Sequence, residues 1–269
     1  MSNSPSQNRN HPQDTSIPPL TVVMIGILAA STSSIFIRFA QQEADSIVIA
    51  SYRLGLATLI LMPWALWRNR VDFTRLQTRE WLLTLAAGVC LGAHFGTWIS
   101  SLAYTNVTSS VVLVQTSPLF VMLLSPLFLQ EPPSRRALLG LLLALLGGLA
   151  IALSDTWCFP ANAICLRMSS SARGTALKGD LLAVAGAISG ALYLIAGRSS
   201  RKTIPLVPYI TLVYGIASLT LLTVALISHL PLRGFSRGTY LWFLLLAIFP
   251  QLLAHSNYNW ALKFLPATT

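Results

Sequence analysis

The sequence Ala57-Thr-Leu-Ile-Leu61 recurs 160 residues later as Ala217-Ser-Leu-Thr-Leu221, without a gap. The same offset also aligns Gly26 with Gly186, Arg38 with Arg198, Gly55 with Gly215, Leu102 with Leu262 and Thr108 with Thr268. Matches between Leu and Ala residues are expected in any apolar chain. Matches of Gly and Arg in separate segments at one offset are not, so the sequence predicts two structural repeats.

The composition is that of an integral membrane protein. Of the 269 residues, 54% are hydrophobic and 10% are charged, whereas soluble domains carry roughly 25% charged residues. The net charge of +10 would suggest a nucleic-acid partner in a soluble protein. Here the basic residues flank apolar segments, which is typical of orientation signals in a membrane protein. The bilayer is therefore the predicted partner, and nucleic acid is not.

Eight segments are long and apolar enough to cross a bilayer, which takes about 20 residues. They are 18–40, 46–67, 80–104, 107–130, 134–154, 179–197, 206–229 and 239–264. A polar, disordered tail is expected over 1–17, and the one long connection covers 155–178. The repeat register restarts after that connection. We therefore expect a first repeat of five helices over 18–154 and a second over 179–269 that shows three.

The predicted fold class is an all-α membrane protein with inverted five-helix repeats, eight helices being visible of an expected ten. The repeats are inverted because an odd number of helices makes the second repeat enter from the opposite side. The second repeat is expected to be incomplete, without counterparts of 107–130 and 134–154. Loop charge favours a cytoplasmic N-terminus. The residues placed inside are Arg9, Arg68, Arg70, Arg75, Arg79, Arg135, Arg136, Arg198, Arg201, Lys202 and Lys263, against Arg167, Arg173, Lys178, Arg233 and Arg237 outside.

The acidic residues argue against a carboxylate relay. All eight lie in the tail, in loops or at helix ends: Asp14, Glu43, Asp45, Asp72, Glu80, Glu131, Asp155 and Asp180. The sequence also has no HExxH motif and no Cys/His spacing typical of metal ligands. We therefore expect no metal, no cofactor and no enzymatic activity.

The third span has two distinct faces. Small residues recur every four positions at Gly88, Gly92 and Gly96, which predicts close approach of another helix. The opposite face carries His94, Thr97, Trp98 and Ser101. These side chains suit lipid poorly, so we predict that they line a cavity. The alternative is a His that bonds to a neighbouring helix and a Trp that only packs.

The eighth span carries a matching polar stripe, formed by Gln251, His255 and Asn259 at a spacing of four. At the repeat offset His255 falls on Phe95, next to His94. The two mid-span histidines therefore sit at nearly equivalent depths, as expected for a pathway lined by both repeats. Coincidence between two structural histidines is the alternative. Because imidazole titrates near neutral pH, proton coupling is a hypothesis, although no buried carboxylate supports it.

Three other features leave alternatives open. In the fourth span Gln115 precedes Pro118, and the carbonyl freed by the proline either contacts substrate or only accompanies a kink. Arg53 lies within the second span and should snorkel or pair, with binding of a substrate anion as a further alternative. Packing rows are expected at Gly140, Ala144 and Gly148 in the fifth span and at Gly186 and Gly190 in the sixth, inside the chain or in a homodimer.

Three segments resemble the drug/metabolite transporter superfamily, specifically its EamA-type branch with two five-helix repeats. They are Ser101-Leu-Ala-Tyr-Thr-Asn-Val-Thr-Ser109, Leu129-Gln-Glu131-Pro-Pro-Ser-Arg-Arg-Ala-Leu-Leu-Gly140 and Ala261-Leu-Lys-Phe-Leu-Pro-Ala-Thr-Thr269. The resemblance covers about 18–269. It implies export or exchange of small metabolites across a bacterial inner membrane by alternating access. It also implies a cavity lined mainly by the third, fourth, eighth and ninth helices, which carry the candidates His94, Trp98, Gln115, His255 and Asn259.

The leading hypothesis is therefore a secondary transporter that moves a small amphipathic solute, such as an amino acid or a relative. A non-catalytic membrane partner or receptor is the first alternative. A membrane-embedded enzyme acting on lipid is the second, and it would need acid–base groups that only His94 and His255 could supply.

Overall fold

The computed structural model describes residues 19–69, 73, 76–130, 134–154 and 170–264, and every regular element in these ranges is a helix. Seven helical spans are long and apolar enough to cross a membrane, and α8 adds a shorter apolar stretch at Ala137–Gly147. The predicted all-helical membrane fold is confirmed. The predicted tail over 1–17 and most of the connection over 155–178 lie outside the described residues.

The helices follow the predicted spans in chain order. The first span is α1 (Pro19–Ser31) with α2 (Ser33–Ala40), and the next two are α3 (Ser46–Arg68) and α5 (Thr78–Tyr104). The fourth is α6 (Val107–Val114) with α7 (Ser117–Phe128), followed by α8 (Arg135–Ser154), α9 (Ser170–Ser200) and α10 (Leu206–Ile227). The last is α11 (Arg237–Leu246), the π-helix η1 (Ala247–His255) and α12 (Ser256–Ala261).

The start of α9 differs from the predicted boundary. This helix begins at Ser170, whereas the apolar run alone suggested 179. Its first residues include Ala, Arg, Leu and Lys, which favour helix but are too polar as a group to read as a membrane span. The search for apolar segments therefore missed the first turns of this helix.

The fourth span breaks at Pro118, and its polar neighbours occupy the carbonyls left behind. Proline has no N–H to donate to Val114 O one turn earlier. The hydroxyl of Ser117 donates to that oxygen instead, at 2.8 Å, and the hydroxyl of Thr116 donates to Leu113 O at 2.6 Å. The freed carbonyl is therefore already paired, which favours the kink over direct contact between this carbonyl and substrate.

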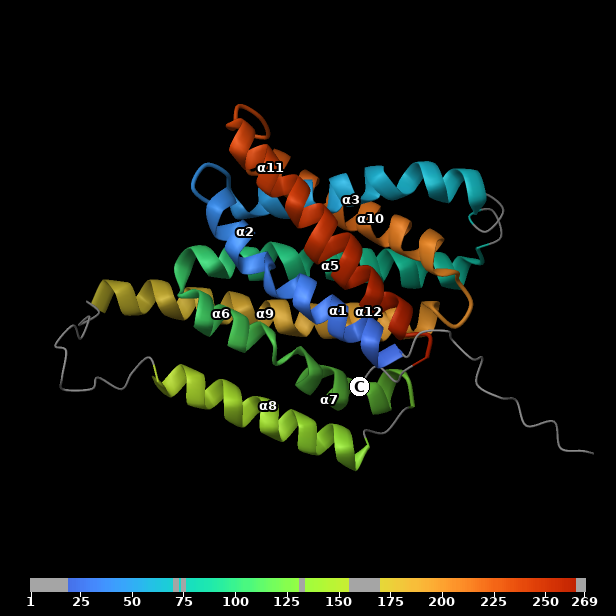
Figure 1. The fold of residues 1–269 in the computed structure, drawn as a ribbon, viewed down its shortest axis with the longest axis horizontal. Coiled ribbons are helices and arrows are strands. Elements are labelled where there is room, and N and C mark those ends of the chain that lie inside the picture. The colour runs from blue at the N-terminus through green and yellow to red at the C-terminus, as the bar shows by residue number, and fades with distance from the viewer. Residues whose placement is uncertain (1–18, 70–72, 74–75, 131–133, 155–169, 265–269) are drawn as a thin grey trace, which may run out of the picture.

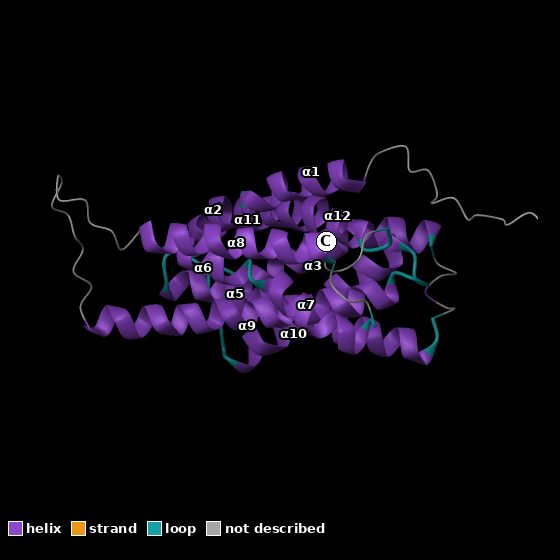
Figure 2. Ribbon diagram, turned by 90° about the horizontal axis from the view of Figure 1, so that it is seen from below, coloured by secondary structure: helices purple, strands orange, loops and turns teal. Residues whose placement is uncertain are grey.

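The spans pair across the two halves of the chain. The first span lies beside η1, α11 and α12, α5 lies along α9, and α3 lies along α10. Figure 1 shows α1–α2 and α11–α12 side by side, running diagonally across the other helices. Figure 2 places these helices on one side of the molecule and α9 and α10 on the other. The bundle thus has a first-and-eighth-span layer and an α5–α9 layer, both of which contact α3.

Close helix crossings repeat at the 160-residue offset. A Cβ atom added to Gly55 would lie 2.9 Å from the Oγ of Ser218, and one added to Gly215 would lie 3.4 Å from the Cγ2 of Thr58. At the 160-residue offset Gly55 corresponds to Gly215, and Thr58 corresponds to Ser218. The two glycine contacts are therefore equivalent. This reciprocity is expected where a pseudo-twofold axis passes between α3 and α10.

A pair of arginine hydrogen bonds obeys the same offset. The guanidinium of Arg38 donates to Leu102 O at 2.7 Å, and that of Arg198 donates to Leu262 O at 2.6 Å. Each bond joins the end of the first helix of a repeat to the end of the third. We call these two contacts the arginine clamps. They give direct structural support to the repeat that the sequence predicted.

A second pair of contacts reinforces the clamps. Gln41 donates to Ile99 O at 2.9 Å, and the equivalent Arg201 donates to Asn259 O at 3.1 Å. The backbone acceptors are conserved between the repeats, while the donor side chain changes from an amide to a guanidinium. The two ends of the bundle are therefore built alike but carry different charge.

The small-residue rows behave differently in α5 and α8. Added Cβ atoms at Gly88 and Gly92 would lie 2.6 Å from Ile216 and 3.2 Å from Ala217 O, so α5 packs tightly on α10. At Gly140 nothing lies within 4 Å, and Ala144 is exposed. Within the described chain this row faces outward, because α8 packs against α6 on its other side. Gly148 falls outside the residues whose surroundings are described.

Candidate functional site

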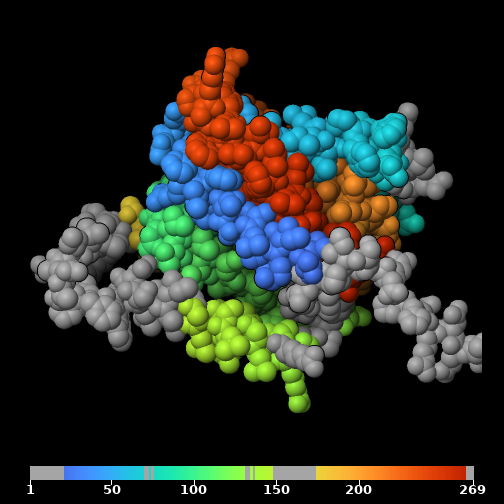
Figure 3. Space-filling model, in the orientation of Figure 1, coloured from blue at the N-terminus to red at the C-terminus, as the bar shows by residue number. Residues whose placement is uncertain are grey.

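A cavity of about 400 Å³ lies between the two layers. Its lining residues are Ile27, Ala30 and Ser31 of α1, Ser34 of α2, His94 and Trp98 of α5, Val111 and Val114 of α6, Gln115, Ser117 and Pro118 at the break before and within α7, Gly190, Tyr193 and Leu194 of α9, His255 and Tyr258. Figure 3 shows the surface of α1 between η1 and α12 on one side and α6 and α7 on the other. The size and the mainly apolar wall suit a small organic molecule.

The cavity spans the boundary between the repeats. Three pairs of its lining residues are related by the 160-residue offset, namely Ala30 with Gly190, Ser34 with Leu194, and Trp98 with Tyr258. The glycine contacts agree, since Gly26 would meet the Tyr258 ring at 2.9 Å and Gly186 would meet Trp98 Cβ at 3.2 Å. A cavity with walls from both repeats can in principle open toward either membrane face.

His94 is fixed by a backbone bond. Its Nδ1 lies 2.8 Å from Gly186 O. A carbonyl can only accept, so Nδ1 carries the proton and a neutral ring presents Nε2 as an acceptor. The ring also stacks on Trp98, with centroids 6.0 Å apart and planes at 23°. His94 therefore bonds to a neighbouring helix, as the structural alternative expected, and its ring also lines the cavity.

His255 approaches His94 from the other repeat. The two ring centroids are 6.4 Å apart, and the centroid of Phe95 lies 5.0 Å from that of His255. The Nδ1 of His255 is buried and has no hydrogen-bond partner among the described residues. The structure thus brings together the two histidines that the sequence placed at similar depth, and leaves one of them with an unused polar atom.

Trp98 carries a second unused polar atom. Its side chain is 8% exposed, and its Nε1–H has no partner among the described residues. The indole N–H can only donate. A buried donor without an acceptor costs about 1–3 kcal/mol, so an oxygen of a bound solute would stabilise it.

Four candidates line the cavity and four do not. Gln115, His94, Trp98 and His255 are in its wall. Thr97 bonds to Ala93 O, Ser101 to Ser110, Gln251 to Arg53, and Asn259 to Tyr193. Gln251 and Asn259 are fully buried. The π-helix shifts the phase of the eighth span, so the three residues of the predicted stripe do not share one surface.

Arg53 is buried deep in the bundle, with 1% of its surface exposed. Its Nε donates to Gln251 Oε1 at 2.8 Å, and a terminal nitrogen donates to Ser33 Oγ at 3.0 Å. The guanidinium carbon lies 3.9 Å from the centroid of the Phe95 ring. Of the alternatives that the sequence left open, pairing with neutral groups describes this arginine, and snorkelling does not.

The cavity wall carries no formal charge of its own. Apart from His94 and His255, none of the described lining residues is acidic or basic. The described residues contain no group of three His, Cys, Asp or Glu side chains that could hold a metal ion. Arg53 lies over the ring of Phe95, which in turn contacts the wall residue His255. The sequence had not singled out Tyr193, Tyr258 or Gly190 as lining residues. The repeat offset from Trp98 would have found Tyr258.

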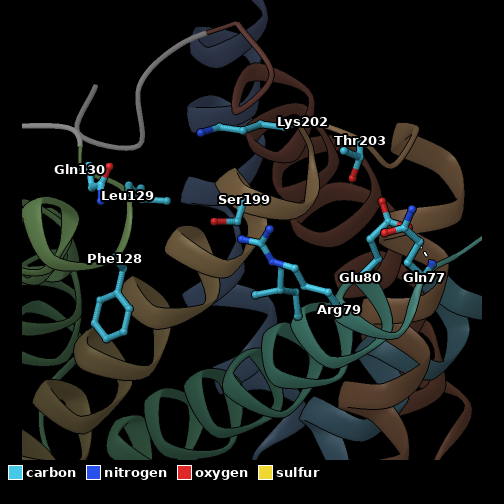
Figure 4. Close-up of a pocket in the computed structure, with 10 residues that line it drawn as sticks. Gln77, Arg79, Glu80, Phe128, Leu129, Gln130, Ser199, Lys202 and Thr203 are labelled. Atoms are coloured by element: carbon cyan, nitrogen blue, oxygen red, sulfur yellow. Dashed lines mark hydrogen bonds between the residues drawn. The ribbon is translucent and has the colours of Figure 1, made fainter.

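A second cavity of about 440 Å³ lies at one end of the bundle, where α5 begins and α7 and α9 end. Figure 4 shows Arg79 and Lys202 extending into this space, opposite Phe128, Leu129 and Gln130. Glu80 lies at its edge and accepts from the backbone N–H of Gln77 at 2.9 Å. This cavity is polar and basic, and its two cations belong to the set predicted to face the cytoplasm.

Together the fold and the cavity define a class: a multi-pass membrane protein with two repeated helical units and a solute-sized site between them. A family model described as the EamA-like transporter family matches residues 18–153 and 177–269. The chain belongs to this family, as the three resembling segments predicted.

The chain is similar to an uncharacterized transporter from Archaeoglobus fulgidus, with 27% identity over 179 residues. The match covers 65% of this chain and 56% of the relative, so it spans little more than half of that protein. A solved structure described as "Crystal structure of protein" covers 90% of this chain and 80% of its own, with a TM-score of 0.65 and 16% identity. That likeness supports the fold alone.

Proposed function

We propose that this protein moves a small amphipathic solute across the membrane through the cavity between its repeats. Amino acids and their relatives are the first solutes to test. The observation that carries the proposal is that walls from both repeats enclose a largely apolar space lined by Trp98 and His255. Trp98 Nε1 and His255 Nδ1 have no hydrogen-bond partner among the described residues. Such groups provide orientation and specificity in an otherwise apolar site.

Alternating access would use the two arginine clamps. They lie at corresponding ends of inverted repeats, hence at opposite ends of the cavity, and each ties the first-and-eighth-span layer to the α5–α9 layer. Release of one clamp at a time would open one end while the other stays closed. We further propose a cytoplasmic N-terminus, a location in a bacterial inner membrane and export as the direction.

The test is solute flux in proteoliposomes with a variant that fills the cavity. Gly190→Leu places a side chain beside His94, because even an added Cβ would lie 2.8 Å from its Nδ1. We expect transport to fall by about tenfold or more, since the wall would occupy the space of the solute. Gly140→Leu is the matched control, because no atom from another part of the described chain lies within 4 Å of a Cβ atom added to Gly140.

Ser34→Leu is a milder second variant. Ser34 lines the cavity, and its repeat counterpart is already a leucine, Leu194, so the bundle accommodates this residue at the equivalent place. Flux reduced in both cavity variants but not in Gly140→Leu would support the proposal. Equal flux in all four proteins would exclude the cavity as the route.

A further inference from the structure

Arg53 is a permanent positive charge held inside the bundle among neutral groups. Its contacts are Gln251, Ser33 and the face of Phe95. The acidic residues within the described ranges are Glu43, Asp45, Glu80 and Asp180. Glu43 and Asp45 lie in the turn before α3, Glu80 lies in the first turn of α5, and Asp180 lies within α9, where it accepts from the hydroxyl of Thr105. A buried charge is normally paired with an opposite charge. This charge has no such partner in the described part of the protein.

Aromatic rings connect Arg53 to the cavity. The guanidinium sits over Phe95, and Phe95 meets the wall residue His255 edge to face, at 5.0 Å and 67°. Rings and helices screen charge much less than water does, so the field of Arg53 extends into the cavity. Among the described residues that line the cavity, none has a carboxylate that would cancel this field.

Trp98 supplies an independent sign of what binds there. The Trp98 side chain lines the cavity and is more than nine-tenths buried, and its N–H donor has no acceptor among the described residues. An oxygen acceptor on the solute would satisfy this donor. A carboxylate accepts more strongly than a neutral carbonyl, because charge assistance roughly doubles the strength of a hydrogen bond.

We propose that the cavity recognises a carboxylate on an apolar body, with Trp98 donating to the carboxylate and Arg53 setting the preference for negative charge. This inference rests on the proposed transport function and narrows its substrate class. For an amino acid, it means that the carboxylate is read and that the ammonium finds no acidic partner in the cavity wall. A des-amino acid should therefore bind at least as well.

The aliphatic part of the cavity wall would accommodate the apolar body. Val111, Val114, Pro118 and Leu194 supply aliphatic groups to this wall. A volume of about 400 Å³ holds a solute with one aromatic ring. Phenylacetate, phenylacetamide and phenethylamine share such a ring and differ in the charge of their head groups, so they form a matched set of probes.

The experiment measures equilibrium binding of these three radiolabelled probes to the full chain in nanodiscs. We expect phenylacetate to bind about tenfold more tightly than phenylacetamide, and phenethylamine to bind most weakly, as the field of one shielded charge predicts. Arg53→Lys keeps the charge and should keep that order. Arg53→Gln should bring the acid and the amide to within about twofold of each other.

The outcomes separate a charge effect from a structural role of Arg53. If Arg53 only held Gln251 in place, Arg53→Gln would weaken all three probes equally, and that result would overturn the inference. If Arg53→Gln does not fold, the relative affinities of the three probes for the wild-type protein still test the inference. Equal binding of phenylacetate and phenylacetamide, or tighter binding of phenethylamine, would contradict it. If Trp98→Phe binds phenylacetate more weakly but keeps the order of the three probe affinities, the result would support the inference.

The Gly190→Leu variant distinguishes this inference from the proposed function. Equal binding of acid and amide, with both lost in Gly190→Leu, would overturn charge selection and leave the cavity as the solute site. Binding that is unaffected by Gly190→Leu would remove the cavity itself, and both proposals would fall. Absence of binding by all three probes would also count against both.

Discussion

Trp98 and Tyr258 hold equivalent positions in the two repeats, and both line the cavity. They differ in chemistry, since the indole N–H only donates whereas a phenol can donate or accept. These two equivalent positions thus differ in hydrogen bonding. This difference would give a small solute a preferred orientation.

We expect Trp98→Phe to weaken phenylacetate binding by about tenfold to a hundredfold, the cost of one hydrogen bond to a charged acceptor. The aromatic ring remains, so the contact with His94 and the thermal stability should change little. Binding in nanodiscs and thermal unfolding in detergent measure the two effects. Unchanged affinity would show that the indole N–H does not contact the solute.

The hydroxyl of Ser117 has a structural task beside the cavity. It takes the place of the N–H missing at Pro118 by donating to Val114 O. Ser117→Ala should lower the free energy of unfolding by about 0.5–1 kcal/mol, as typical for polar contacts in membrane proteins. Ser189→Ala is the matched control, because Ser189 donates to Ala185 O within an unbroken helix. Equal losses in unfolding free energy, measured by denaturant titration in detergent, would contradict this role.

At the scale of an element, α11 begins at a charge-assisted cap from a distant turn. Glu43, in the turn between α2 and α3, accepts from the backbone N–H of Ser236 and from the hydroxyl of Thr239, both at 2.8 Å. These two donors hold the pKa of the Glu43 carboxyl below its usual value. The ionised carboxylate therefore ties the first span to the eighth.

Glu43→Gln should lower the thermal stability at neutral pH. A depressed pKa in the folded state contributes stability above the unfolded pKa of about 4.3, and that contribution is lost as the pH falls through the folded pKa. The gap in melting temperature between wild type and Glu43→Gln should therefore narrow below about pH 4.5. A gap that is constant between neutral and acidic pH would mean that the charge of Glu43 is irrelevant to the cap.

The arginine clamps make a prediction about access. Arg38→Ala and Arg198→Ala each remove one bond between the layers, at opposite ends of the cavity. A cysteine at Ser117, with Cys90, Cys158 and Cys165 replaced by alanine, reports access to an impermeant maleimide. We expect one variant to increase labelling in right-side-out vesicles and the other in inside-out vesicles. Increased labelling from the same side in both would contradict the assignment of the clamps to opposite gates.

The spans themselves were predictable, because length and hydropathy alone fix where a helix can cross a bilayer. Local irregularities of the backbone were less predictable than the spans. Pro118 indicated the break between α6 and α7, whereas Pro250 did not indicate that η1 would be a π-helix. The outward row at Gly140 was also beyond prediction, since a small-residue spacing shows that a helix can pack closely but not which neighbour it meets.

For the molecule as a whole, the repeat was the most informative signal in the sequence. The clamp from Arg38 to Leu102 and its counterpart from Arg198 to Leu262 follow from the 160-residue offset without any shift. The repeat therefore predicted the architecture better than it predicted the site.

Only the three-dimensional structure showed which half of the candidate site residues line the cavity. Helical periodicity put His94 and Trp98 on one face, and both line the cavity. It also grouped Gln251 and Asn259 with His255, yet both are buried against Arg53 and Tyr193. The π-helix adds to the turn and rotates the face, which an assumed period of 3.6 residues cannot anticipate.

The central claim, that the solute binds between the repeats, is tested most directly by photo-crosslinking. Phenylacetate carrying an aryl azide would be photolysed with the protein in nanodiscs, and labelled peptides would be identified by mass spectrometry. We predict adducts on α5 around His94 and Trp98 and on α9 around Gly190, all abolished by excess unlabelled phenylacetate. Label on α8 or at the second cavity around Arg79, or label that competitor does not displace, would contradict the claim.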